Sequence, residues 1–175
     1  MIKVMLAISQ IVGKPGQAME VSLSEQIENT AGYPDVVCFS EPVTIEGVLK
    51  NTGKQMVLNA VCCTEAKILC SRCLAEVNVP ISFQIEETFY PAGYTEQEKE
   101  KEAETFSDDR IDVSGIIERG ILAGLPMKVV CREQCKGLCS KCGKNLNEGP
   151  CSCDHTEFDP RLESLRSLFN VDEEV

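Results

Sequence analysis

The sequence lacks most of the residue patterns on which enzymes depend. Its 175 residues include a single histidine, His155. It has no glycine-rich phosphate loop and no nucleophile elbow, and without a second histidine it cannot build the usual hydrolytic zinc site. Acidic pairs such as Asp108 and Asp109 are typical of solvated faces in so acidic a chain. We therefore predict no catalytic residue.

Long apolar runs are also missing, because no stretch approaches the ~20 residues that a membrane helix needs. The segment from Met1 to Gly13 has one lysine ahead of a short apolar run, which Ser9 and Gln10 interrupt. Such a segment is a poor signal peptide. Hydrophobic residues at 43% and charged residues at 26% are typical of soluble globular proteins. We expect a cytoplasmic protein.

Basic residues are few. Seventeen Lys and Arg stand against 28 Asp and Glu, which gives a formal net charge of −11. A surface with this charge repels phosphate backbones unless its cations gather in one place. The composition therefore disfavours a large nucleic-acid footprint.

Strand-like sequence fills the region from Val36 to Tyr90, where β-branched and aromatic residues partly alternate with polar ones. This pattern predicts an antiparallel meander with turns at residues 51–54, near Thr64, and at residues 70–76. The segment Met1–Val12 is a candidate for a further strand. The segment Ser22–Glu28 reads as a short helical turn with Ser22 as its N-cap.

The predicted fold class is α+β: an antiparallel β-rich body (residues 1–90), an acidic linker (91–110), and a C-terminal helix, zinc module and helix (111–175) packing on or near the sheet. In this last part, Asp112 can cap a helix that Gly124 and Pro126 end. Asp159 and Pro160 open the second helix. The apolar stripe of the first helix comprises Val113, Ile116, Ile117, Ile121 and Leu122, and that of the second Leu162, Leu165, Leu168 and Phe169.

Eleven cysteines carry the chemistry, six of them between Cys131 and Cys153. Cys139 and Cys142 flank two residues and precede Gly143, a spacing typical of a knuckle that grips a tetrahedral ion. Cys151 with Cys153, or Cys131 with Cys135, can complete a four-thiolate site. Zinc is the expected metal, with iron–sulfur ligation as the less favoured alternative.

A second pair, Cys70 and Cys73, lies at a predicted turn between strands. Its addition gives eight thiols, enough for two four-thiolate sites or for one that bridges the two regions. No βαβ pattern surrounds the pair, which disfavours a redox role of the thioredoxin type. We expect His155 at the surface beside the cluster, with a ligand role as the alternative. Three further cysteines, in strand-like sequence, are expected to be packing residues: Cys38, Cys62 and Cys63.

The region from Ile111 to Leu165 resembles the YceD family, also called the large ribosomal RNA subunit accumulation proteins. The motifs that carry the resemblance are Glu118 in the Asp-led helix, the Leu125-Pro126-Met127 turn, Cys135-Lys136-Gly137-Leu138-Cys139, Cys142-Gly143, Asn145-Leu146-Asn147 and Asp159-Pro160-Arg161. Upstream, Cys70-Ser71-Arg72-Cys73-Leu74 is similar to the family's Cys-x-Arg-Cys-Leu turn.

The resemblance implies a bacterial, non-enzymatic ribosome-assembly factor that supports accumulation of large-subunit (23S) ribosomal RNA. The net charge favours a basic ribosomal protein, alone or on a precursor particle, as its partner. One alternative is a zinc module that binds RNA directly, and another is a thiol oxidoreductase that uses Cys70 and Cys73. The residues predicted to contact a partner are Arg72, Lys136, Lys141, Lys144 and Arg161.

Overall fold

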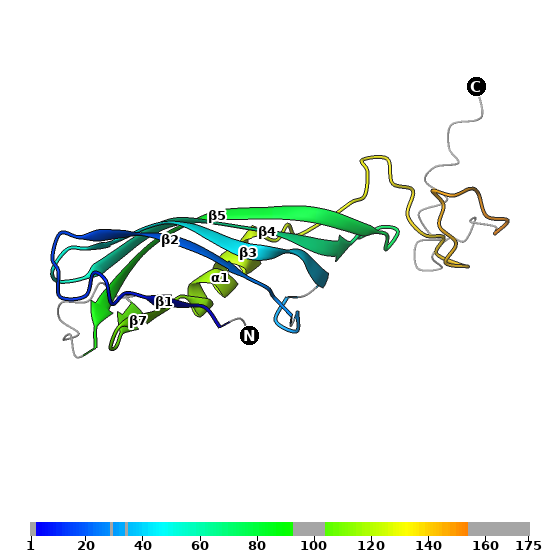
Figure 1. Cartoon of the computed structure of the whole chain (residues 1–175). Coiled ribbons are helices and arrows are strands. Elements are labelled where there is room, and N and C mark those ends of the chain that lie inside the picture. The colour runs from blue at the N-terminus through cyan, green and yellow to red at the C-terminus, as the bar shows by residue number, and fades with distance from the viewer. Residues whose placement is uncertain (1–2, 29, 34, 93–103, 154–175) are drawn as a thin grey trace, which may run out of the picture.

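The computed structural model describes residues 3–28, 30–33, 35–92 and 104–153, and most of its regular structure is β-sheet (Figure 1). A five-stranded sheet has the order β2-β3-β4-β5-β6, and β1 pairs with β7 in a separate two-stranded sheet. Among the described residues, no helix has both the length and the apolar character to cross a membrane. The elements are β1 (Met5–Ala7), β2 (Ala18–Glu25), β3 (Val36–Asn51), β4 (Met56–Leu69), β5 (Glu76–Pro91), β6 (Glu104–Phe106), β7 (Arg110–Asp112) and α1 (Ser114–Gly124).

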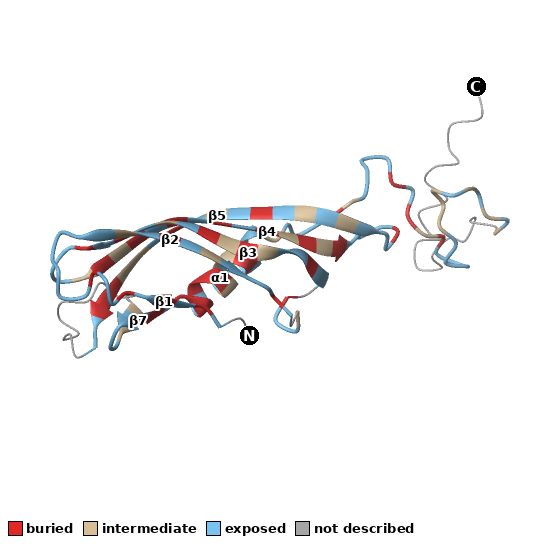
Figure 2. Ribbon diagram, viewed as in Figure 1, coloured by how far each residue is buried: buried red, intermediate tan, exposed pale blue. Residues whose placement is uncertain are grey.

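The predicted antiparallel meander is confirmed as the long strands β3, β4 and β5. Along β4, every second residue from Met56 to Ile68 is buried, because neighbouring side chains of a strand point to opposite faces. Figure 2 shows this alternation across the sheet. The turn predicted at residues 51–54 also forms, and in it Gly53 adopts φ +97° and donates its N–H to Oδ1 of Asn51 at 2.7 Å.

Two local predictions are wrong. The turn expected near Thr64 does not form, because β4 runs through it and the Thr64 hydroxyl donates to the carbonyl of Glu41 at 2.9 Å. The helical turn expected at Ser22–Glu28 is instead strand β2 as far as Glu25. There the period of two in the sequence places Val21 inward, and pairing with β3 outweighs a weak helix-capping pattern.

Helix α1 confirms the prediction of a helix after Asp112, but its N-cap residue is Val113 and not Asp112. The backbone N–H of Ser114 donates to Oδ1 of Asp112 at 2.9 Å, and hydrogen bonds from Ser114 hold the pKa of Asp112 below its usual value. Ile117 and Ile121 are fully buried, whereas Leu122, predicted in the apolar stripe, is 45% exposed. At about 100° per residue, Leu122 is turned roughly 140° from Ile117, so it lies on the side of the helix away from the sheet.

Two glycines set how closely α1 approaches β5. A Cβ on Gly120 would collide with the ring of Phe83, and a Cβ on Gly124 would press on Ile81. The helix thus covers one face of the sheet together with β1 and β7, and one core fills the space between them. Each large aliphatic side chain buried there contributes about 1.5–3 kcal/mol to stability.

The region predicted as an acidic linker contains strands at its C-terminal end. β6 pairs in parallel with the end of β5, and β7 pairs with β1. Residues 93–103 and the second predicted helix, which begins at Pro160, lie outside the described residues. For these two segments the predictions stay predictions.

We expect Gly120→Ala to lower the free energy of unfolding by about 1–3 kcal/mol, because the added methyl group overpacks against Phe83. Gly115→Ala in the same helix is the control. It meets only the flexible end of Arg119, at 3.4 Å, so helix propensity should raise stability by up to about 1 kcal/mol. Urea denaturation measures both changes. Equal stabilities of the two variants would contradict the close packing of α1 on β5.

Candidate metal centre

The turn between β4 and β5 presents two cysteines. The backbone closes it through hydrogen bonds from Cys70 N to the Ala75 carbonyl (2.8 Å) and from Leu74 N to the Cys70 carbonyl (2.9 Å). Leu74 adopts φ +58°, which lets the chain reverse directly after Cys73. The side chains of Cys70 and Cys73 are both buried at the tip of the hairpin.

The segment that follows α1 is bound to this turn by backbone hydrogen bonds. Ser71 N donates to the Val129 carbonyl at 2.8 Å, and Leu138 N donates to the Arg72 carbonyl at 3.0 Å. The guanidinium of Arg72 donates to the Cys135 carbonyl at 2.9 Å. A close approach of backbones occurs where Gly137, at φ +75°, lies against the Arg72 carbonyl. These contacts place the thiols of two distant segments side by side.

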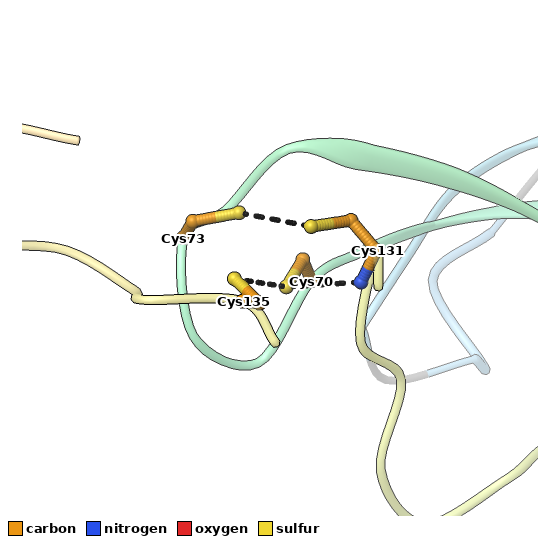
Figure 3. Close-up of side chains that lie close together, drawn as sticks. All are labelled: Cys70, Cys73, Cys131 and Cys135. Carbon is orange, nitrogen blue, oxygen red and sulfur yellow. Dashed lines mark hydrogen bonds between the residues drawn. The ribbon is translucent and has the colours of Figure 1, made fainter. Parts of the chain in front are cut away.

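The first cluster comprises Cys70, Cys73, Cys131 and Cys135 (Figure 3). All four sulfurs lie within 4.8 Å of one another, with 3.9 Å between Cys70 and Cys135 and 3.6 Å between Cys73 and Cys131. A tetrahedral ion with bonds of about 2.3 Å to sulfur separates its ligands by roughly 3.8 Å. The cluster therefore has the dimensions of a one-ion tetrahedral site.

The second cluster comprises Cys139, Cys142, Cys151 and Cys153, whose sulfurs also lie within 4.8 Å of one another. The turn after Cys139 has the predicted knuckle form: Gly143 N donates to the Cys139 carbonyl at 2.9 Å, and Gly143 adopts φ +71°. Cys142 N points to the sulfur of Cys139 at 3.5 Å. This cluster is more open than the first, because Cys142 is exposed and Cys151 and Cys153 are half-buried.

Asn147 joins the two clusters. It belongs to the segment of the second cluster, yet its side-chain amide donates to the sulfur of Cys135 in the first, at 3.4 Å. Its Oδ1 accepts the backbone N–H of Lys136 at 2.9 Å. Between the clusters, Leu138 and Asn145 form an antiparallel bridge. The short hairpin that contains Leu138 and Asn145 thus fixes the position of one cluster relative to the other.

Backbone N–H groups also favour the thiolate form of one cysteine in each cluster. Burial raises the pKa of Cys70, but donation from the N–H groups of Arg72 and Cys131 outweighs it and brings the pKa to about 6. The N–H groups of Cys142 and Lys141 lower the pKa of Cys139 to about 6 as well. Because metals bind thiolates, each cluster offers one ligand that is already ionised at neutral pH.

The structure resolves the alternatives that spacing left open. The eight thiols form two groups of four, one of which bridges the two cysteine regions. The sequence singled out all eight residues but missed the role of Asn147, although the Asn145-Leu146-Asn147 motif was a visible signal. Of the cysteines expected to be packing residues, only Cys62 is buried, whereas Cys38 and Cys63 are exposed because they face away from the core.

Four of the five residues predicted to contact a partner lie on or beside the clusters, namely Arg72, Lys136, Lys141 and Lys144. Lys136, Lys141 and Lys144 are exposed, and Lys144 donates to the Pro150 carbonyl at 2.9 Å. Arg72 is exposed but also serves the local structure through its bond to Cys135. His155 and Arg161 lie outside the described residues. The contact roles of Arg72, Arg161 and the three lysines stay predictions, as does the expected surface position of His155.

Comparison with known families matches residues 59–169 to the family described as "Large ribosomal RNA subunit accumulation protein YceD". The match includes the β4–β5 turn and both cysteine clusters. The chain belongs to the YceD family. The resemblance noted in the sequence is thereby confirmed.

Relatives of this YceD-family chain come from bacteria and a plant. YlbN of Bacillus subtilis, named as uncharacterized, is 26% identical over 168 residues, which cover 95% of this chain and 97% of YlbN. An uncharacterized protein of Mycobacterium tuberculosis is 32% identical over 108 residues, 61% of this chain and 52% of that protein. "Large ribosomal RNA subunit accumulation protein YCED homolog 1, chloroplastic" of Arabidopsis thaliana is 36% identical over 58 residues, 33% of this chain and 18% of its own. No solved structure matches the chain.

We expect the folded protein to bind two metal ions, and Cys73→Ser and Cys142→Ser each to release one of them. Each substitution removes a thiolate from a different cluster. Cys63→Ser is the control, because Cys63 is exposed and belongs to neither cluster. Elemental analysis after gel filtration measures ions per chain. Release of an ion by the control, or two ions retained in both cluster variants, would contradict the assignment.

We expect Asn147→Ala to weaken metal binding at the first cluster by about 10–100-fold, although Asn147 is not a ligand. The substitution removes the amide that orients and stabilises the Cys135 thiolate. Gln134→Ala, an exposed position in the same segment, should leave the affinity unchanged. Competition with a chromophoric chelator measures both affinities. An unchanged affinity of Asn147→Ala would show that the contact has no energetic role.

Proposed function

We propose that the chain is a non-enzymatic ribosome-assembly factor that supports accumulation of large-subunit ribosomal RNA by binding a basic ribosomal protein or a precursor particle. Membership in a family whose description names this accumulation carries the proposal. The plant relative has the same words in its name. The net charge of −11 favours a basic protein over an RNA surface as the first contact.

A structural role for the cysteines supports the absence of catalysis. Each cluster offers four cysteine sulfurs, which as thiolates would fill a tetrahedral shell, whereas catalytic zinc keeps one position for water or substrate. The segment Cys131–Cys153 has few buried apolar residues of its own, since its buried side chains are mainly cysteines. Metal binding would therefore supply most of the free energy that orders it.

Zinc is the proposed metal. Sulfurs within 4.8 Å of one another leave space for a single ion. An iron–sulfur cluster places several iron and sulfide atoms between its thiolates, so its cysteine ligands must stand farther apart. The absorption spectrum of protein purified without oxygen separates the two, because a bound iron–sulfur cluster absorbs visible light and zinc does not.

The two alternatives rest on particular residues. Direct RNA binding is favoured by the exposed Lys136, Lys141 and Lys144 beside the clusters. Thiol oxidoreductase activity would use Cys70 and Cys73. It is disfavoured because each of these sulfurs lies within 4 Å of a further thiol, from Cys135 and Cys131, in an arrangement suited to a metal.

We expect the tagged protein to co-sediment with large-subunit precursors at physiological salt and to crosslink to a ribosomal protein. Substitution of the three lysines by alanine removes the contact that the RNA-binding alternative needs, and the crosslink to the ribosomal protein should persist. Absence from precursor particles and from ribosomal proteins at low and physiological salt would overturn the proposal. Crosslinks to RNA alone, lost with the three lysines, would replace it with the RNA-binding alternative.

A further inference from the structure

Among the described residues, the edge of strand β5 opposite β4 is unpaired over most of its length. On one side β5 pairs with β4 from Glu76 to Phe89 without interruption. On the other side β6 covers only Phe89–Pro91. Within residues 3–28, 30–33, 35–92 and 104–153, no other strand pairs with this side of β5, which forms a margin of the sheet in Figure 1. An exposed row of backbone N–H and C=O groups is a template for another strand.

The backbone groups that face this edge can be identified. Ala92 N donates to the Phe106 carbonyl on the β6 side, at 2.8 Å. Because successive residues of a strand direct their N–H and C=O groups to opposite sides, the groups of Ser82, Gln84 and Glu86 face the open edge. The backbone nitrogen of Pro80 faces the same open side, and a proline is tolerated there because no hydrogen bond to β4 is lost.

A groove of about 520 Å³ runs beside the edge, between β5 and α1. Phe83 and Ile116 contribute apolar surface to it, and Gly120 keeps the helix close to the strand. A strand added to β5 would direct every second side chain into this groove and the others over the outer face of the sheet. The site therefore offers both main-chain hydrogen bonds and side-chain contacts, the two elements of recognition by strand addition.

The charge of the groove selects a basic occupant. Glu86 and Glu87 line it, and a second hollow of about 310 Å³ on the adjoining part of the sheet adds Glu46. The one basic residue among the groove's lining residues, Arg119, is already paired with Glu104 at 3.1 Å. RNA and a second copy of this acidic chain would both bring charge of the same sign.

We infer that the open edge of β5, from Ser82 to Thr88, binds an extended segment rich in lysine and arginine from a partner protein, as an added β-strand. The inference rests on the proposed function and deepens it, because a strongly basic ribosomal protein supplies such a segment. It places the partner contact on the sheet, apart from the exposed lysines of the cysteine segment.

Hydrogen exchange with a defined probe tests this directly. The probe is a twelve-residue peptide in which lysine and valine alternate, added to the full-length, metal-loaded protein. We expect slower exchange at the amides of Ser82, Gln84 and Glu86, resolved by NMR. A peptide of equal charge with proline in place of every second valine should give no protection, because it cannot pair as a strand. Protection elsewhere on the protein, or equal effects of both peptides, would overturn the inference.

Proline substitution tests the edge itself. Gln84→Pro removes an amide that faces the open edge, and we expect it to weaken peptide binding by about fivefold or more, as for the loss of one hydrogen bond. The control is Ser22→Pro on β2, at the opposite margin of the sheet. Because Asn51 N donates to the Gln17 carbonyl at 2.8 Å, the amide of Ser22 likewise faces away from its neighbouring strand. Equal binding by the two variants would contradict the inference.

Charge reversal gives an independent measurement should a proline variant fail to fold. Glu86→Lys with Glu87→Lys should weaken peptide binding by about tenfold or more at low salt, whereas Glu20→Lys with Glu25→Lys on β2, which changes the net charge equally, should have little effect. Equal losses in both proteins would indicate attraction by net charge alone and overturn the inference.

The same variants separate this inference from the proposed function. If co-sedimentation with precursor particles persists in Gln84→Pro and in the double charge reversal, the β5 edge is not the contact, while the assembly role stands. If the unmodified protein associates with no ribosomal component, the assembly role itself fails. RNA fragments that protect the β5 amides would also overturn the inference.

Discussion

The convergence of four thiols from two distant segments is the interaction on which the C-terminal third of the structure depends. Cys70 and Cys73 occupy a hairpin whose shape is set by β4 and β5, so their positions are rigid. Cys131 and Cys135 come from a segment with little regular structure. The described residues after α1 are thus positioned relative to the sheet through this group and the hydrogen bonds beside it, and Asn147 links the second cluster to the first.

The sheet and the cysteine segment are stabilised in two different ways. The sheet side is held by apolar burial over a core shared by the strands and α1. The cysteine segment has almost no such core, and its polar side chains and glycines serve the turns around the sulfurs instead.

The sequence predicted the parts of this structure that depend on local pattern. Period-two alternation identified the meander, and Asp112 with the isoleucines identified α1. Thr64 was misread because a polar residue in a core position looks like a turn until its partner, the Glu41 carbonyl, is known. All eight clustered cysteines were found, but their grouping was left open between alternatives, because the first cluster depends on a contact between residues about sixty positions apart.

The long separation in sequence between Cys73 and Cys131 affects the stability of the whole chain. Through its sulfurs, the first cluster ties residue 73 to residue 131 and encloses β5, β6, β7 and α1 in one loop. A crosslink that closes a loop of this length and persists in the unfolded chain raises the free energy of that chain by roughly 4 kcal/mol through lost entropy, when judged as a disulfide would be. An ion held there acts as a crosslink that a reducing compartment cannot open, so metal supply and the stability of the sheet are linked.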